Sequence, residues 1–207
     1  MKDRYIVAIT GASGAIYGVR LVEVLSKAEC EIHLTITEAA AKVISHELMV
    51  PLDLENEEEV KRFFGNNVIY YHYNQLESPI ASGSYKTNGM IVVPCSVGAL
   101  GRIASGISNN LVERAADVML KERRKLILVP RETPFSSIHL ENMLRLSNAG
   151  AVILPAIPGF YHHPRSIDDQ VDFVVSRILD HLGIDNQLIK RYGELSKLQS
   201  KSNIFED

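Results

Sequence analysis

Small, hydroxyl-bearing or charged residues directly follow several short apolar runs of this chain. Short apolar runs bounded by turn residues are typical of buried parallel strands, and open parallel sheets bind ligands beyond the carboxyl ends of their strands. The residues at those ends are Gly11–Gly14, Thr37, Pro94–Ser96, Arg131–Glu132 and Pro155–Tyr161. Because cations and hydroxyls outnumber carboxylates among them, they favour a phosphorylated ligand.

The first of these turns, Gly11-Ala12-Ser13-Gly14, opens a predicted helix. The N–H groups and dipole of a helix start suit a phosphate, and Ser13 adds a hydroxyl. The spacing is GxxG and not GxGxxG. The motif alone therefore does not separate a phosphate turn from a tight strand–helix turn without a ligand.

A second strand–helix turn follows at Pro94-Cys95-Ser96. Ser96 is predicted as the N-cap of the next helix, as a ligand contact, or as both. Cys95 is interpreted as a small buried residue, because no base lies near it in sequence. Cys30 is far from it, so the two cysteines indicate neither a disulfide framework nor a metal motif.

Basic residues supply the candidates for binding an anion. Arg114 and Lys121 are seven residues apart and share one face of a predicted helix, which fits either a solvated face with ion pairs or a phosphate contact. Arg131 offers a planar fork for phosphate oxygens, and Glu132 beside it can move protons. Arg177 has a salt bridge with Asp180 as its alternative role.

The adjacent histidines of Phe160–Pro164 suggest a metal at first sight, but no HExxH or Cys/His cluster accompanies them. We therefore expect no metal.

Strands and helices alternate along most of the chain, which predicts an α/β fold, a Rossmann-like parallel sheet with helices on both faces. We expect one domain over residues 1–207, with about 195–207 a flexible tail. The expected strands cover residues 5–10, 32–37, 68–71, 89–93, 125–129 and 151–154, and the expected helices begin near 15, 38, 96, 139 and 167.

The length, composition and charge of the chain limit its protein class and its possible partners. The chain has 207 residues, 46% of them hydrophobic, and a formal net charge of −3. These values fit a globular domain and give no sign of a nucleic-acid or membrane partner. Two distant cysteines fit a cytoplasmic location.

Long segments resemble the UbiX family of flavin prenyltransferases. They are GASGAIYGVRL, PCSVGALGRIASG, NNLVERAADVMLKERRKLILVPRETP, HLENM and PGFYHHP followed by VSRILDHLGI, and the resemblance covers nearly all of residues 4–184. It implies transfer of a dimethylallyl group from dimethylallyl monophosphate to N5 and C6 of reduced FMN, without a metal. It also implies a homododecamer that binds FMN where subunits meet.

The resemblance also implies residue roles. FMN contacts are expected at Gly11, Ala12, Ser13, Thr37, Ser96, Val97, Gly98, Ala99 and Arg131. Prenyl-phosphate contacts are expected at Arg114, Lys121, Arg131, Tyr161 and Arg177, and catalytic roles at Ser13, Glu47, Glu132, Lys121 and Tyr161. We expect Lys121, Arg131 and Arg177 to converge around the departing phosphate.

Two positions depart from the family pattern of Ser at 37 and Ser-x-x-Thr at 96–99. Thr37 keeps a hydroxyl, whereas Ala99 loses one. The product, prenylated FMN, is expected to serve a UbiD-type decarboxylase in ubiquinone synthesis or aromatic acid metabolism.

Three other functions remain as alternatives. A peptidyl-cysteine decarboxylase of related fold carries a PxMNxxMW stretch, but this chain has Pro94-Cys95-Ser96 there and no Trp. A non-catalytic FMN carrier would leave the basic residues without a purpose. A nicotinamide-dependent reductase is disfavoured by the GxxG spacing.

Overall fold

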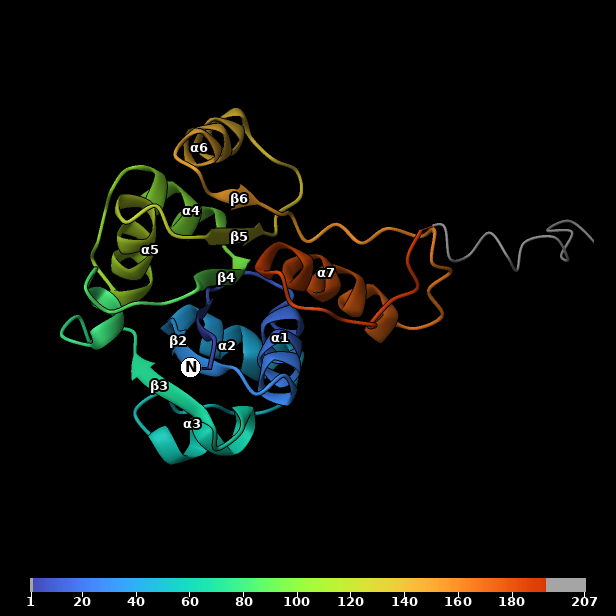
Figure 1. Ribbon diagram of the computed structural model, residues 1–207, viewed down its shortest axis with the longest axis horizontal. Coiled ribbons are helices and arrows are strands. Elements are labelled where there is room, and N and C mark those ends of the chain that lie inside the picture. The colour runs from blue at the N-terminus through green and yellow to red at the C-terminus, as the bar shows by residue number, and fades with distance from the viewer. Residues whose placement is uncertain (1, 193–207) are drawn as a thin grey trace, which may run out of the picture. The chain divides into compact units, whose positions relative to one another are not determined.

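The computed structural model describes residues 2–192, and its central feature is a six-stranded parallel sheet (Figure 1). The strand order is β3-β2-β1-β4-β5-β6, and every pairing is parallel. This order is that of a doubly wound Rossmann sheet. The chain builds the sheet outward from β1 to β3 on one side and then from β4 to β6 on the other, so the switch point lies between β1 and β4. The predicted α/β, Rossmann-like class is confirmed.

The elements follow the expected alternation. The strands are β1 Arg4–Ile9, β2 Glu31–Ile36, β3 Val68–His72, β4 Gly89–Cys95, β5 Leu126–Pro130 and β6 Val152–Ile153. The helices are α1 Ala15–Lys27, α2 Glu38–Glu47, α3 Glu57–Phe64, α4 Val97–Ala104, α5 Leu111–Lys121, α6 Ser137–Asn148 and α7 Ile167–Leu182, and η1 Pro79–Ala81 is a short 3-10 turn. The stretch 78–84, predicted as a loop, thus contains this turn, and β6 is shorter than predicted.

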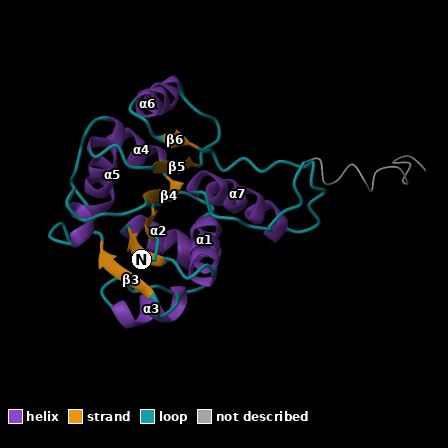
Figure 2. Cartoon of the chain, in the orientation of Figure 1, coloured by secondary structure: helices purple, strands orange, loops and turns teal. Residues whose placement is uncertain are grey.

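Helices cover both faces of the sheet. Ile6 and Ala8 of β1 belong to a buried cluster with residues of α4, α5 and α6. Because side chains alternate along a strand, Ile9 points to the other face, where it lies against Gly18 of α1. A Cβ on Gly18 would lie 2.5 Å from the carbonyl oxygen of Val93, so glycine permits α1 to cross this close. Figure 2 shows α5 and α1 on opposite sides of the strands.

The chain divides into two compact units, Met1–Ala156 and Ile157–Asp207. The first contains the whole sheet. In the second, α7 begins with a capping box in which Ser166 and Asp169 bond reciprocally to backbone N–H groups, and it ends at Gly183 in the left-handed conformation. These are strong start and stop signals, so α7 has its predicted bounds. The predicted tail, residues 195–207, lies outside the described residues.

Over residues 2–192, no helix combines the length and the apolar character that crossing a membrane requires.

Candidate functional site at the carboxyl edge of the sheet

The carboxyl ends of the parallel strands bring four predicted segments to one edge of the sheet. Residues 10–14 follow β1, Thr37 follows β2, residues 96–99 follow β4, and Arg131 with Glu132 follows β5. The sheet order reverses between β1 and β4, and a crevice at such a point is where open α/β sheets bind ligands. The sequence therefore placed these segments correctly relative to one another.

Thr10 ties the two central strands together at this point. Its buried Oγ1 donates to the carbonyl oxygen of Pro94 at 2.8 Å and accepts from the N–H of Ser96 at 2.7 Å. Its own N–H also bonds to the Pro94 carbonyl oxygen, at 3.2 Å. Sequence reasoning missed Thr10. The one available signal was a hydroxyl residue at the end of a buried strand.

The hydroxyls of Thr37 and Ser96 cap the helices that start here. Thr37 Oγ1 accepts from Ala40 N at 3.2 Å, and Ser96 Oγ accepts from Ala99 N at 3.2 Å. The N-cap prediction for Ser96 is confirmed, and Thr37 caps α2 in the same way. Because each oxygen still carries a proton to donate, capping leaves either hydroxyl able to contact a ligand.

The glycine turn after β1 is shaped by helix α2. A Cβ on Gly11 would lie 2.4 Å from the Cβ of Ala39, so only glycine allows the turn to approach α2 this closely. Gly14 has a φ of 99°, a backbone conformation that residues other than glycine rarely adopt.

A carboxylate of the chain itself lies on the start of α1. Glu47, at the end of α2, accepts from Gly14 N at 2.9 Å and from Ala15 N at 2.9 Å. The prediction that these N–H groups are open to a phosphate is therefore wrong for Gly14 and Ala15, because the carboxylate satisfies the same donors and dipole. The arrangement also brings Glu47 to Gly14, the residue that follows Ser13, and both Glu47 and Ser13 are among the expected catalytic residues.

Arg131 extends the edge beyond β5. It is exposed, and its N–H bonds to the carbonyl oxygen of Cys95 at 3.3 Å, which joins it to the end of β4. Its charge is felt at Tyr17 of α1: burial raises the pKa of Tyr17, and Arg131 opposes that rise. Arg131 thus lies at the carboxyl edge of the sheet, near the first turn of α1. Glu132 accepts from Thr133 N at 2.9 Å.

Lys121 and Arg114 both lie on helix α5, apart from Arg131. Lys121 ends α5, which returns to the start of β5, and its Nζ is 2.7 Å from where a Cβ on Gly83 would be, in the loop before β4. Arg131 follows the other end of β5, a five-residue strand that spans roughly 13 Å at its usual rise. The expected convergence of Lys121 with Arg131 therefore does not occur within one chain.

Both α5 cations have partners in the chain. Arg114 donates from Nε to the carbonyl oxygen of Ala81 at 3.1 Å and pairs with Asp117 at 2.9 Å. Lys121 pairs with Glu122. The alternative of a helix face with ion pairs is thus realised, while both cations stay partly exposed.

Tyr161 and Arg177 belong to the second unit. The Tyr161 ring lies 5.8 Å from the ring of Phe173, and Arg177 follows Phe173 by four residues of α7. Residues four apart share a helix face, so Tyr161 and Arg177 lie on the same side of α7. The alternative ion pair of Arg177 is present, with its Nη1 2.8 Å from Asp180 Oδ2.

His162, the first of the two adjacent histidines in the second unit, takes part in packing. The His162 ring stacks on Phe173 at 5.3 Å between centroids, and its Nε2 lies 3.3 Å from the carbonyl oxygen of Asp169.

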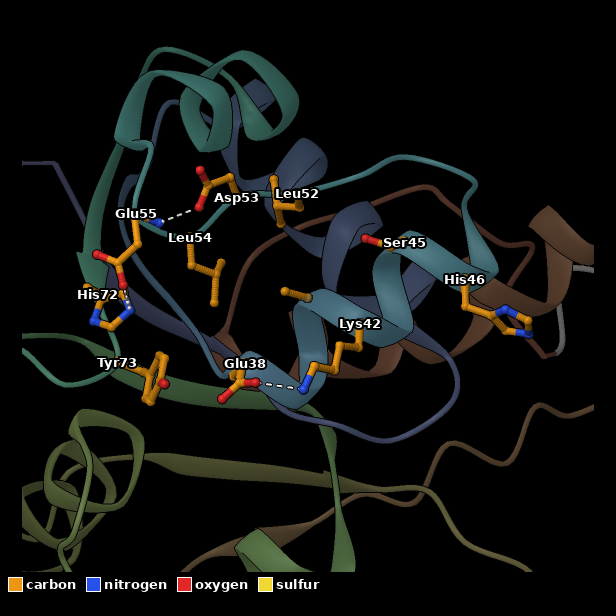
Figure 3. Close-up of a pocket in the computed structure, with 11 residues that line it drawn as sticks. Glu38, Lys42, Ser45, His46, Leu52, Asp53, Leu54, Glu55, His72 and Tyr73 are labelled. Atoms are coloured by element: carbon orange, nitrogen blue, oxygen red, sulfur yellow. Dashed lines mark hydrogen bonds and ion pairs between the residues drawn. The ribbon is translucent and has the colours of Figure 1, made fainter.

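A pocket of about 710 Å³ lies between α2, the loop before α3 and the end of β3 (Figure 3). Figure 3 shows Glu38 joined to Lys42, at 2.6 Å, and Glu55 against His72, at 3.3 Å. Among the described residues, its lining includes none of the predicted flavin or phosphate contacts. Its charged groups are largely paired with one another, so we base no function on it.

Comparison with known proteins identifies the class. Residues 1–179 match the family model described as Flavoprotein. Together with the strand order, this match defines a Rossmann-like flavoprotein.

A flavin prenyltransferase UbiX of Halalkalibacterium halodurans is 51% identical over 196 residues, which cover 93% of this chain and 95% of the relative. The chain belongs to the UbiX family of flavin prenyltransferases.

Two solved structures resemble this chain in both fold and sequence. AnUbiX (PadA1) in complex with FMN and dimethylallyl pyrophosphate has a TM-score of 0.85 and 41% identity, over 93% of this chain and 98% of that one. A dodecameric FMN-dependent UbiX-like decarboxylase from Escherichia coli O157:H7 has a TM-score of 0.83 and 42% identity, over 91% and 98%.

Proposed function

We propose that this enzyme transfers a dimethylallyl group from dimethylallyl monophosphate to N5 and C6 of reduced FMN. The observation that carries the proposal is the carboxyl edge of the sheet, where Thr37 follows β2, Ser96 follows β4 and Arg131 follows β5. Relatives of about half identity are named flavin prenyltransferases, and a similar structure was solved with FMN and dimethylallyl pyrophosphate.

The residues present at the carboxyl edge fit a flavin mononucleotide. Gly11 lies in the turn after β1, packed against Ala39 of α2, and the hydroxyls of Ser13, Thr37 and Ser96 can donate to phosphate or ring oxygens. The remaining expected contacts, Ala12, Val97, Gly98 and Ala99, are small or aliphatic residues whose backbone lines the same edge. When bound and reduced, FMN supplies the nucleophilic ring atoms to which the five-carbon group becomes attached.

The protein stabilises the leaving phosphate. As the allylic C–O bond breaks, negative charge grows on the phosphate oxygens, and a fixed guanidinium stabilises that charge more than it stabilises the bound substrate. Arg131 takes this role at the carboxyl edge. Tyr161 and Arg177, which share one side of α7, add a hydroxyl and a second guanidinium.

Protons move through carboxylates. Ring closure requires that one carbon of the allylic group gains a proton and that the flavin ring loses one. Glu132 follows Arg131 directly, and Glu47 is held beside Ser13 by its bonds to Gly14 N and Ala15 N. We assign the proton transfers to Glu132 and to the pair Glu47 and Ser13.

Lys121 and Arg114 act on a neighbouring copy in this proposal. Lys121 lies at the opposite edge of the sheet from Arg131, so it contributes to the phosphate site only if another subunit presents it, and we assign Arg114, on the same helix, to that subunit as well. A homododecamer provides such neighbours, and a relative of 42% identity is dodecameric. Ion pairing with Asp117 and Glu122 keeps both cations oriented before assembly.

We further propose that the two units form one flavoprotein domain, because the Flavoprotein match spans residues 1–179 and crosses their boundary. The product would serve a UbiD-type decarboxylase. A cytoplasmic location is supported by Cys30 and Cys95, which are both free thiols and buried.

The proposal is tested by anaerobic incubation with reduced FMN and dimethylallyl monophosphate. Mass spectrometry is expected to detect one added five-carbon unit on the flavin. Tight binding of an unaltered flavin would favour a carrier function. Release of carbon dioxide from a cysteinyl peptide would favour a decarboxylase.

A further inference from the structure

Glu113 of α5 is a carboxylate with 0% exposure that no step above uses. A buried charge is stable only when it is paired and hydrogen-bonded. Glu113 accepts from Asn109 N at 2.8 Å and from Asn110 Nδ2 at 2.9 Å, and it pairs with Nε of Arg102. It therefore fixes one edge of the Arg102 guanidinium against α5.

The other edge of that guanidinium lies at the first turn of α4. Nη1 of Arg102 is 3.3 Å from where a Cβ on Gly98 would be, so the guanidinium occupies the space beside the Gly98 backbone. Its charge reaches Cys95 as well: burial raises the pKa of Cys95 to about 12, and Arg102 opposes that rise. The Arg102 side chain is 44% exposed, which leaves its Nη groups accessible.

The first turn of α4 offers the Ser96 hydroxyl and the N–H groups of Val97 and Gly98 as donors, but no charged side chain. Ser96 N is bonded to Thr10, and Ala99 N is bonded to Ser96 Oγ. Gly98 and Ala99 have no side-chain donor. Arg102 therefore supplies the positive charge at the segment that the flavin is expected to contact.

We propose that Arg102, oriented by Glu113, is a binding residue for the phosphate of the flavin nucleotide at the start of α4. The inference rests on the proposed function, which places the flavin at this edge. A guanidinium held at Nε and accessible at Nη offers donors in a fixed plane, which suits phosphate oxygens.

Riboflavin separates this role from a structural one, because it has the ring system of FMN but no phosphate. Fluorescence titration of the full chain with oxidised FMN and with riboflavin is expected to show that Arg102→Met weakens FMN binding roughly 10- to 100-fold, as for loss of a charge-assisted hydrogen bond. Riboflavin binding is expected to stay unchanged. Equal losses for both ligands, or unchanged FMN binding, would overturn the assignment.

Two further variants keep the test decisive. Arg102→Met leaves Glu113 buried without its cation, so the double variant Arg102→Met/Glu113→Gln removes that charge while keeping a hydrogen-bond acceptor. It is expected to regain melting temperature and still lose the preference for FMN. Arg145→Met is the matched control, because Arg145 Nη1 contacts the carbonyl oxygen of Ala104 at the opposite end of α4, at 3.4 Å. It is expected to bind both ligands like the wild type.

These titrations contain no prenyl donor, so they fail independently of the proposed reaction. If the wild type prefers FMN but forms no prenylated product, the proposed reaction is contradicted. The binding test of Arg102 still applies in that case. A wild type that binds riboflavin as tightly as FMN would contradict the role of Arg102 whatever the reaction is.

Discussion

The two edges of the sheet use polar residues in opposite ways. At the amino edge, Glu31 bonds Arg4 at 2.5 Å and the fully buried His33 at 2.8 Å, and Tyr85 covers them with its ring 4.4 Å from the Arg4 guanidinium. At the carboxyl edge, hydroxyls cap helices and Arg131 is exposed. Polar groups that bond among themselves hold the strands together, whereas groups that retain donors toward solvent are available to a ligand.

The sharpest test of this difference is Arg131→Ala. We expect a loss of at least roughly 100-fold in kcat/KM for dimethylallyl monophosphate, because a fixed cation near the leaving phosphate is removed. The melting temperature should change little, since the side chain is exposed. Steady-state kinetics and thermal melts measure both, with Arg62→Ala on α3 as the control. A matching loss of stability would assign Arg131 to the fold instead.

The reverse result is expected at the amino edge for Glu31→Ala. Removing the acceptor leaves buried His33 and half-buried Arg4 without their partner, at a cost of about 1–3 kcal/mol. Denaturant unfolding should show this loss, while the folded fraction keeps wild-type turnover. Glu23→Ala, which breaks exposed pairs with Arg20 and Lys27, should cost at most about 1 kcal/mol. Loss of turnover in folded Glu31→Ala would show that the two edges are not separate.

Thr10→Val tests whether the bridge between β1 and β4 belongs to the site. The change keeps the shape and removes the bonds to Pro94 and Ser96, so we expect a loss of about 1–2 kcal/mol in stability and weaker FMN binding. Thr35→Val is a matched control, because Thr35 Oγ1 is buried and has no hydrogen-bond partner among the described residues. Equal effects of the two changes would remove the special role of Thr10.

The smallest expected effect is a pH dependence of stability from His33. Burial lowers its pKa, only partly opposed by Glu31, while Arg4 lowers it further; the rings of Tyr71 and Tyr85 cover it. The folded pKa thus lies below the unfolded value of about 6.5. The unfolded state then binds more protons, so the unfolding free energy should fall as pH drops below that value and stay level above it.

Denaturant titrations between pH 5 and 8 measure this slope, and His33→Gln should reduce it. The carboxyl of Glu31 has its pKa held at about 2 by Arg4, so it stays charged throughout that range. An unchanged slope in His33→Gln would assign the dependence to another group.

Local signals made most of the fold predictable. Apolar runs gave the strands, and Ser166 with Asp169 and Gly183 gave the bounds of α7. The residues after each strand were predictable as a group, because parallel strands share one carboxyl edge. The Asn110-x-x-Glu113 spacing is a capping pattern, but neither the full burial of Glu113 nor its bond to Arg102 can be read from it.

The sequence did not show how deeply a residue is buried or which residues of different elements come into contact. Glu47 covers the start of α1 because α2 brings the two together, and no local pattern encodes that contact. Lys121 and Arg131 are only ten residues apart in sequence, yet β5 lies between them and separates them by its full length. The cations suggest one site by type, and only the topology shows that a single chain does not bring Lys121 and Arg131 together.

Mixing subunits tests that central claim most directly. Lys121→Ala and Arg131→Ala are each expected to be inactive alone. If a site takes Arg131 from one subunit and Lys121 from its neighbour, co-assembly in equal amounts restores about a quarter of the sites by random assortment. The account predicts that the mixture regains prenyl transfer to reduced FMN. A mixture as inactive as the separate variants would contradict it.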